Sequence, residues 1–294
     1  MTDQPKNQYR VLVRGSGDVG SAVAHGLLGA GYVVVLHDQP QPATTRRGMA
    51  FTDAIFDGQA TLEGVAARRL DHLPDLGVLL ATGILLVVVV PFDLLVAALQ
   101  PDVLVDARMR KRSQPEVQRG LAALTIGLGP NFVAGDTVDR AVETSWGPDL
   151  GQVISHGPTQ PLAGEPRSLG GHGRERLVYA PVDGLFHTEH RIGDAVQAGE
   201  VVGSIDPVAL SAPLSGRLRG LTHDGVPVVR GTKVIEVDPR DTAAGGLVAM
   251  TGIGERPGRI AAGVLQAIQE WMDARTAERR QASLAADAAE ERRE

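Results

Sequence analysis

The chain of 294 residues can bury two separate hydrophobic cores, because 43% of its residues are hydrophobic. Its formal net charge of -6 argues against general attraction to nucleic acid or to an anionic membrane surface, since both require a positive protein surface. The lack of cysteine excludes disulfides, thiolate-ligated metal clusters and a thiol nucleophile. Residues 1–10 are polar and do not resemble a secretory signal, so we expect a cytoplasmic protein.

The first predicted unit is a strand, a glycine turn and a helix. An apolar run at residues 11–13 leads into Gly15-Ser-Gly17-Asp18-Val-Gly20, and apolar residues at helical spacing follow. In this pattern the glycines form a tight turn, let a pyrophosphate approach the backbone and let the helix pack on the strand. The helix N-terminus offers free N–H groups to an anion. Asp18 would oppose a phosphate, which favours the alternative that the glycines serve only the turn.

An acid and two arginines follow the second predicted strand, residues 32–36. Asp38 lies at the distance from the glycines at which an acid could accept hydrogen bonds from a ribose. Arg46 and Arg47 stand where a phosphate or carboxylate could be bound, because a guanidinium group binds such anions through two parallel hydrogen bonds. The alternative is a solvated basic loop.

Residues 76–92 carry no charge over 17 positions, which is near the lower limit for crossing a bilayer. Glycines and a proline interrupt this stretch, and the β-branched residues 87–90 are typical of a strand buried on both faces of a parallel sheet. We therefore expect no membrane span. A predicted helix at residues 92–99 and a strand at residues 103–105 continue the alternation of a doubly wound sheet.

A basic cluster follows the strand at residues 103–105. It contains Asp106, Arg108 and Arg110 and continues into Lys111 and Arg112. Ligands of doubly wound sheets bind beyond the carboxyl ends of the strands, so the sequence predicts an anion-binding edge here. The alternative is the charged start of a surface helix.

A second glycine loop follows a predicted strand at residues 124–126. Gly127 and Gly129 suggest that this loop forms a second wall of a ligand crevice, and Pro130 indicates that the loop is rigid. Asn131 could hydrogen-bond with the edge of a base or a pterin. The alternative is an ordinary crossover turn.

The C-terminal half contains an internal repeat at an offset of 32 residues. The repeated residues are Ala180, Pro181, Gly184, Gly193, Val196, Gly199, Val202, Asp206 and Pro207, which recur as Ala212, Pro213, Gly216, Gly225, Val228, Gly231, Val234, Asp238 and Pro239. The repeat resembles the small flattened β barrel of biotinyl and lipoyl carrier domains. Residues 204–211, which join the two copies, contain no lysine, so we expect no biotin or lipoyl attachment.

We thus expect an α/β fold: a Rossmann-like parallel sheet, a small biotinyl/lipoyl-like (hammerhead) β barrel and a C-terminal helix. The predicted parts are a dinucleotide-type domain at residues 8–150, a Gly/Pro-rich linker at 151–175, the barrel at 176–240, a docking segment and helix at 241–272, and a charged tail at 273–294. His187 and His190 flank Glu189, but we interpret them as part of a solvated turn and predict no metal site.

Several motifs in one order resemble the selenium-dependent molybdenum hydroxylase accessory family. They are Arg14-Gly-Ser-Gly-Asp18, Arg46-Arg47, residues 103–107, Gly127-Leu-Gly-Pro130, Gly170-Gly171, Asp238-Pro-Arg240 and Gly263-Val-Leu265. The resemblance implies a maturation protein that handles a molybdopterin-type cofactor or a dinucleotide and has a molybdenum hydroxylase as its client. An oligomer remains open.

Two alternative functions follow from the same residues. A NAD(P)-dependent oxidoreductase would use the first glycine loop for pyrophosphate and Asp38 for ribose, but the sequence offers no catalytic pair. A structural scaffold would leave the nucleotide-type fold empty. The sequence therefore assigns no catalytic residue and does not decide whether the protein is an enzyme.

Overall fold

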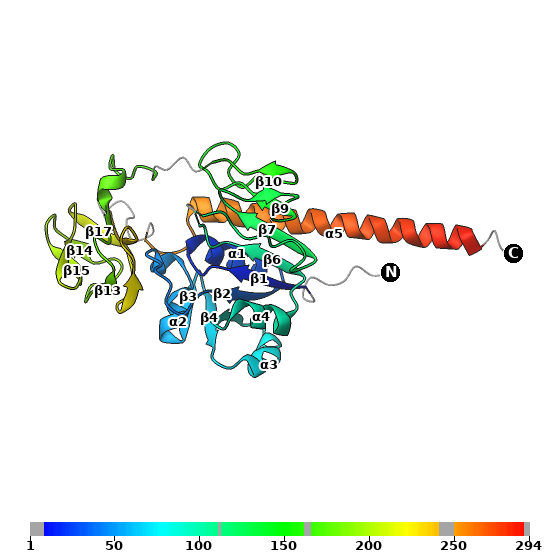
Figure 1. The fold of residues 1–294 in the computed structure, drawn as a ribbon, viewed down its shortest axis with the longest axis horizontal. Helices are drawn as coiled ribbons and strands as arrows, with labels where there is room; N and C mark the ends of the chain where they lie inside the picture. The colour runs from blue at the N-terminus through cyan, green and yellow to red at the C-terminus, as the bar shows by residue number, and fades with distance from the viewer. Residues whose placement is uncertain (1–8, 111–112, 162–165, 241–249, 291–294) are drawn as a thin grey trace.

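The structure, a computed structural model, describes residues 9–110, 113–161, 166–240 and 250–290. It contains a large mixed sheet, three smaller sheets and a long C-terminal helix (Figure 1). The predicted α/β class with a large parallel sheet and a C-terminal helix is therefore confirmed. Lys111, Arg112 and residues 241–249, for which we made predictions, lie outside the described residues.

The large sheet has nine strands in the order β10-β9-β7-β6-β1-β2-β5-β4-β3. Strands β9 to β4 in this order run parallel, and β10 and β3 join the two edges antiparallel. Their bounds are β1 Arg10–Arg14, β2 Val33–His37, β3 Gln59–Leu62, β4 Val65–Leu70, β5 Leu85–Val88, β6 Val103–Asp106, β7 Leu124–Leu128, β9 Arg140–Val142 and β10 Val153–Ile154. A separate two-stranded sheet pairs β8 Val133–Ala134 with β11 Gly157–Pro158.

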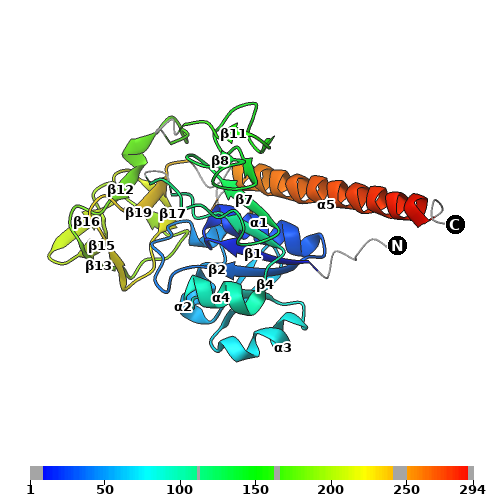
Figure 2. The same ribbon diagram turned by 45° about the vertical axis from the view of Figure 1, so that its right-hand side comes forward.

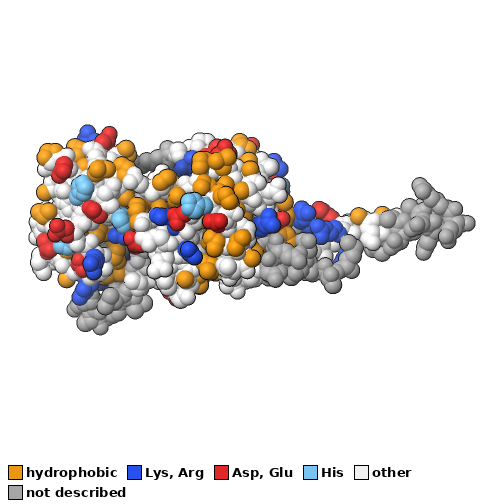
Figure 3. All heavy atoms as spheres, turned by 90° about the horizontal axis from the view of Figure 1, so that it is seen from below, with side chains coloured by type: hydrophobic (Ala, Val, Ile, Leu, Met, Phe, Trp, Pro, Cys, Tyr) orange, Lys and Arg blue, Asp and Glu red, His pale blue; other side chains and the backbone are white. Residues whose placement is uncertain are grey.

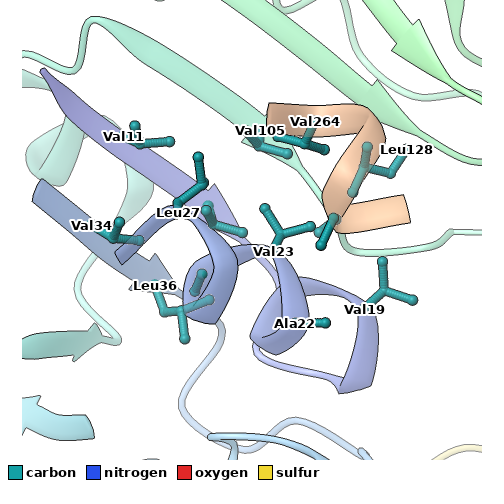
Figure 4. Packing of buried hydrophobic residues seen from close by; sticks show 14 of the residues in the cluster. Val11, Val19, Ala22, Val23, Leu27, Val34, Leu36, Val105, Leu128 and Val264 are labelled. Carbon is teal, nitrogen blue, oxygen red and sulfur yellow. The ribbon is translucent and has the colours of Figure 1, made fainter. Parts of the chain in front are cut away.

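Helices cover both faces of this sheet because its central strands are apolar on both faces. On one face α1 (Asp18–Gly29), α2 (Asp53–Asp57) and α5 (Glu255–Glu290) share a core with Val11 and Val13 of β1. On the other face α3 (Leu76–Leu80) and α4 (Phe92–Leu99) pack around Leu12 of the same strand. Figure 4 shows Leu27 of α1 beside Val11 and Val34, and Val264 of α5 beside Val105 of β6. Short 3-10 turns are η2 Arg47–Met49, η3 Leu73–Asp75 and η4 Arg174–Arg176.

The uncharged stretch at residues 76–92 is divided among α3, the buried strand β5 and the start of α4. The predicted buried strand is present, but it spans Leu85–Val88 and not residues 87–90; Val89 and Val90 follow it and are half-buried. Val78 of α3 and Leu94 of α4 remain exposed. Figure 3, seen from the side of α3 and α4, shows hydrophobic side chains on this face. Within the described part of the chain, none of the helices combines the length and hydropathy that crossing a bilayer demands.

The internal repeat forms two four-stranded sheets that share one core. The first copy supplies β12 Leu177–Tyr179, β13 Gly184–His187, β14 Ala195–Val196 and β15 Val201–Ile205, and the second supplies β16 Val208–Ser211, β17 Gly216–Leu221, β18 Val226–Val228 and β19 Lys233–Asp238. The orders β12-β19-β17-β14 and β16-β15-β13-β18 place two strands of each copy in each sheet. Neither copy can therefore bury its apolar residues without the other.

Three local features of the structure were either not predicted or were predicted differently. The β3–β4 hairpin and α3 carry short, mixed patterns that gave no periodic signal, so they were not predicted. The expected linker at residues 151–175 begins inside the sheets, because β10 and β11 pair with earlier strands. The docking helix and the charged tail form one helix that projects beyond the sheet (Figures 1 and 2).

Candidate functional site

The predicted binding residues lie around one edge of the large sheet. The chain leaves β1 toward β2 on one side and returns through β6 on the other side of β1. Arg14 of β1 is in register with Asp106 of β6, and Asp106 with Gly127 of β7. The carboxyl ends of these neighbouring strands therefore meet at the point where the strand order reverses, which is where ligands bind in such sheets.

The first glycine loop is closely packed at two positions and open at the third. Gly15 has a φ of +103°, and a Cβ there would lie 2.9 Å from the Ala107 carbonyl oxygen. A Cβ on Gly20 would overlap the Gly15 carbonyl oxygen and lie 3.3 Å from the Cβ of Ala107. Gly17 is the N-cap of α1 and receives no side-chain cap, and a Cβ there would meet Thr44 only at 4.0 Å. Gly17 is half-buried but leaves room beside the helix terminus, as an anion site requires.

Asp38 holds the glycine loop from β2. Its Oδ2 accepts hydrogen bonds of 2.7 Å from both the backbone N–H and the hydroxyl of Ser16, and its Oδ1 accepts from the N–H of Gln39 at 2.8 Å. Both oxygens therefore bond within the protein, and the arrangement favours a loop-shaping role over ribose binding.

We expect Asp38→Asn to lower the free energy of unfolding by about 1–3 kcal/mol, because the loop loses charge-assisted hydrogen bonds. Urea unfolding measures this change, and Asp71→Asn, at an exposed position, is the control. We also expect NADH and NADPH titrations to show no micromolar binding to the wild type. Micromolar binding that disappears in Asp38→Asn would restore the ribose role.

A second ion-pair cluster surrounds Asp106, which is 1% exposed. Asp106 bonds with Arg108 and Gln118, and the exposed Glu116 pairs with Arg14 at 2.9 Å and with Arg108 at 2.6 Å. Arg110 also pairs with Glu116. The arginines beside Glu116 hold the pKa of its carboxyl well below the usual range, although partial burial opposes this. Arg108 and Arg110, predicted to meet an anionic ligand, thus bind carboxylates of the chain itself.

Arg47 is also engaged within the protein. It pairs with Asp53 at 2.7 Å and donates through Nε to the carbonyl oxygen of Leu221 in β17 at 2.8 Å. It borders a cavity of about 540 Å³ that is also lined by Asp57 and Glu63. The acidic lining of this cavity does not suit a phosphate, so Arg47 serves mainly to join η2 to the C-terminal sheets.

The second glycine loop packs against its own surroundings. A Cβ on Gly127 would overlap the Phe132 ring, and Gly129, at φ +98°, lies against Thr144 and Met109. Asn131 has a φ of +75° and donates through Nδ2 to the carbonyl of Ser113 at 3.2 Å. These contacts account for the loop residues structurally.

A cluster of charges that the sequence did not predict centres on Glu236 of β19. Glu236 is fully buried and accepts from Arg46 at 3.2 Å, from Arg176 at 2.6 Å and from Lys233 at 2.8 Å, while Arg219 lies 3.8 Å away. Burial alone would raise the pKa of Glu236, but Lys233 and Arg46 lower it far below the usual value. One carboxylate therefore stays ionised among four cations.

Arg46 connects this cluster to the first glycine loop. Its Nη1 donates to Asp18 Oδ2 at 3.1 Å, and the other oxygen of Asp18 accepts from the N–H of Val19 at 3.0 Å. Burial would raise the pKa of Asp18, but the combined effect of Arg46, Lys233 and Arg256 lowers it. Arg256, in the first turn of α5, donates to the carbonyl of Thr144 at 2.7 Å. The cluster thus connects the first glycine loop, α5 and the C-terminal sheets.

Lys233, Glu236 and Arg256 were missed because they are far from the glycine loops in sequence. A charged residue at position 236 between the apolar residues 234, 235 and 237 was the available signal, since a buried charge requires partners. His187 and His190, considered for metal binding, instead face Asp224 at 3.3 Å and Asp194 at 3.6 Å.

The site defines the chain as an α/β protein with a glycine loop at the reversal point of a parallel sheet. No protein-family model matches the chain. It is 36% identical over 268 residues to the uncharacterized protein YqeB of Escherichia coli (strain K12), an alignment that covers 91% of this chain and 49% of that protein. The chain therefore spans about half the length of this curated relative.

Similarity to solved structures is low. Succinylglutamate desuccinylase/aspartoacylase from Rhodobacter sphaeroides is 25% identical with a TM-score of 0.19, covering 29% of this chain and 30% of that one. The ectoine utilization protein EutE (DoeB) from Ruegeria pomeroyi is 12% identical with a TM-score of 0.24, covering 79% of this chain and 85% of that one. Neither likeness bears on function.

Proposed function

We propose that the chain is a cytoplasmic accessory protein for the maturation of molybdenum hydroxylases that holds a phosphorylated pterin or nucleotide at the first glycine loop. The observation that carries the proposal is the N-terminus of α1 at the edge where β1 and β6 end: Gly17 leaves room there for a ligand, although the Asp18 carboxylate already accepts from the N–H of Val19. The motif resemblance described above supplies the client class, and no catalytic group is assigned.

The C-terminal sheets are the proposed contact with the client enzyme. We interpret them as a closed barrel of the biotinyl/lipoyl-like type without a carrier role, because the connection from β15 to β16 contains no lysine. Lys233 does not substitute for an attachment site, since its amine bonds with Glu236 inside the cluster. The arginines Arg46 and Arg47 join these sheets to the glycine loop side of the large sheet.

The sequence predicted that Arg46 and Arg47 bind a phosphate of the ligand, but the structure gives both side chains partners within the protein. Arg47 pairs with Asp53, and Arg46 pairs with Glu236 and Asp18, so Arg46 could meet a phosphate only as part of this charge cluster. Backbone N–H groups at Gly17 are the main proposed contact instead. Phosphate binding by Arg108 and Arg110 would similarly require release of Glu116.

Gly17→Ala tests the proposed position of the ligand. The added Cβ would meet only Thr44 Cγ2, at 4.0 Å, and the backbone angles of −66° and −177° suit alanine, so folding should be unchanged. The methyl group would occupy space above the helix N-terminus. We expect mass spectrometry of small molecules released from natively purified protein to detect a phosphorylated pterin or nucleotide with the wild type, and to detect much less with Gly17→Ala.

Gly29→Ala, at the exposed end of the same helix, is the matched control and should retain the ligand. Deletion of the gene should lower the molybdenum cofactor content of a hydroxylase in the same cell, and the wild-type gene should restore it. Normal cofactor content after deletion would overturn the maturation role. Full ligand retention by Gly17→Ala would overturn the assigned position.

A further inference from the structure

The cluster between the first glycine loop and β19 contains more positive than negative charge. Five cations and three carboxylates interact there, which leaves a surplus of two positive charges; the cations are Arg46, Arg176, Arg219, Lys233 and Arg256, and the carboxylates are Asp18, Glu143 and Glu236. The neighbouring pairs Arg47–Asp53 and Arg240–Asp238 are each neutral. Burying unmatched charge is costly, so the surplus favours an anion.

The cations differ in how deeply they lie. Arg176 and Arg219 are 2% and 13% exposed and surround Glu236, whereas Arg46 and Lys233 are 28% and 29% exposed. Among the described residues, no acceptor reaches the buried Nε of Arg176 or of Arg219. The deep cations therefore fix Glu236, and the outer ones present charge toward solvent.

The third outer cation is Arg256. Its guanidinium donates to the backbone carbonyl of Thr144. Among the described residues, no carboxylate accepts a hydrogen bond from it. Burial lowers the pKa of Lys233 and the charge of Glu236 raises it, while repulsion from the nearby Arg46 opposes Glu236 and lowers it again. An added anion would relieve this repulsion.

Asp18 is the resident anion of the cluster. Asp18 is the first residue of α1, and its carboxylate accepts from Arg46 and from the N–H of Val19. A cation and a backbone N–H of this kind also bind a phosphate at a helix N-terminus. Removal of this carboxylate would raise the positive surplus and vacate the helix N-terminus.

From these observations we infer that Arg46, Lys233 and Arg256 form a binding site for a phosphate group with two negative charges, next to the N-terminus of α1. Arg176, Arg219 and Glu236 position Arg46 and Lys233. The identity of the remainder of the ligand rests on the proposed function. The residues of the phosphate site come from β19 and α5 as well as from the glycine-loop side. Two charges match a phosphate monoester or a pyrophosphate diester.

Isothermal titration calorimetry of the full chain with inorganic phosphate and with inorganic pyrophosphate tests the site, with chloride at equal ionic strength as the reference. We expect one phosphate per chain. Lys233→Met and Arg256→Gln should each weaken binding about tenfold or more, and Asp18→Asn should strengthen it, because a nearby repulsive charge is removed. Arg119→Gln, which removes a cation paired with Asp139 outside the cluster, should leave binding unchanged.

Tighter binding of phosphate would indicate a monoester ligand, and tighter binding of pyrophosphate a dinucleotide. Unchanged affinity in both Lys233→Met and Arg256→Gln, or no binding to the wild type at about 10 mM of either anion, would overturn the site. If Lys233→Met fails to fold, Arg256→Gln and Asp18→Asn still decide the question, since neither removes a partner of Glu236. Phosphate binding without any copurified pterin or nucleotide would leave the site standing and contradict the proposed function.

Discussion

Replacing Glu236 with glutamine is expected to lower the free energy of unfolding by about 3–5 kcal/mol. Glu236 is fully buried and bonds with Arg46, Arg176 and Lys233. Glutamine keeps the shape of the side chain but leaves Arg176 and Lys233 without their carboxylate partner, and Arg46 with Asp18 alone, at a position that is closed to water. Urea unfolding followed by circular dichroism measures the change.

Two further variants identify the cause of this loss. Glu278→Gln, at an exposed position of α5, should change the free energy of unfolding by less than about 0.5 kcal/mol. Glu236→Gln combined with Arg176→Met should be more stable than Glu236→Gln alone, because one unpaired buried cation is removed. A Glu236→Gln protein as stable as the wild type would show that the cluster does not hold the C-terminal sheets in place.

The same residue predicts a pH dependence. The folded-state pKa of Glu236 lies far below the value of about 4.3 for an unfolded glutamate. A lowered pKa stabilises the fold fully above the unfolded value, and this contribution is lost as the pH falls below about 4. The wild type should therefore lose stability more steeply in this acid range than Glu236→Gln does.

Gly20→Ala is expected to destabilise the protein by about 3 kcal/mol or more, or to prevent folding. A Cβ at this position would overlap the Gly15 carbonyl oxygen, lie 3.0 Å from the Gly15 carbonyl carbon and press on Ala107. The turn and α1 cannot separate without shifting β1 against β6, because these strands pair beside the loop.

Gly29→Ala is the matched control for this prediction. Gly29 belongs to the same helix, and a Cβ there would meet nothing within 4 Å. Its free energy of unfolding should change by less than about 1 kcal/mol, in the stabilising direction, because alanine is the better helix former. Equal stability of Gly20→Ala and Gly29→Ala would contradict the close packing of helix, turn and strand.

The sequence by itself determined the parts of the fold that local patterns encode. The run from β1 through Gly15 to α1, the helix α4 and the strand β6 follow from apolar periodicity and from glycine turns, which depend on neighbouring residues. The internal repeat predicted that its two copies would combine, and both sheets contain strands of each. The sequence also placed Gly17 at the N-terminus of α1.

Tertiary structure decided which charges meet. Arg46 and Glu236 are 190 positions apart and Arg256 belongs to α5, so no local pattern brings them together. Sequence reasoning therefore placed Arg46, Arg47, Arg108 and Arg110 at a ligand, whereas the fold supplies carboxylates to each of them. Ion pairing depends on distance and burial, and both are set only when separate sheets and helices pack against one another.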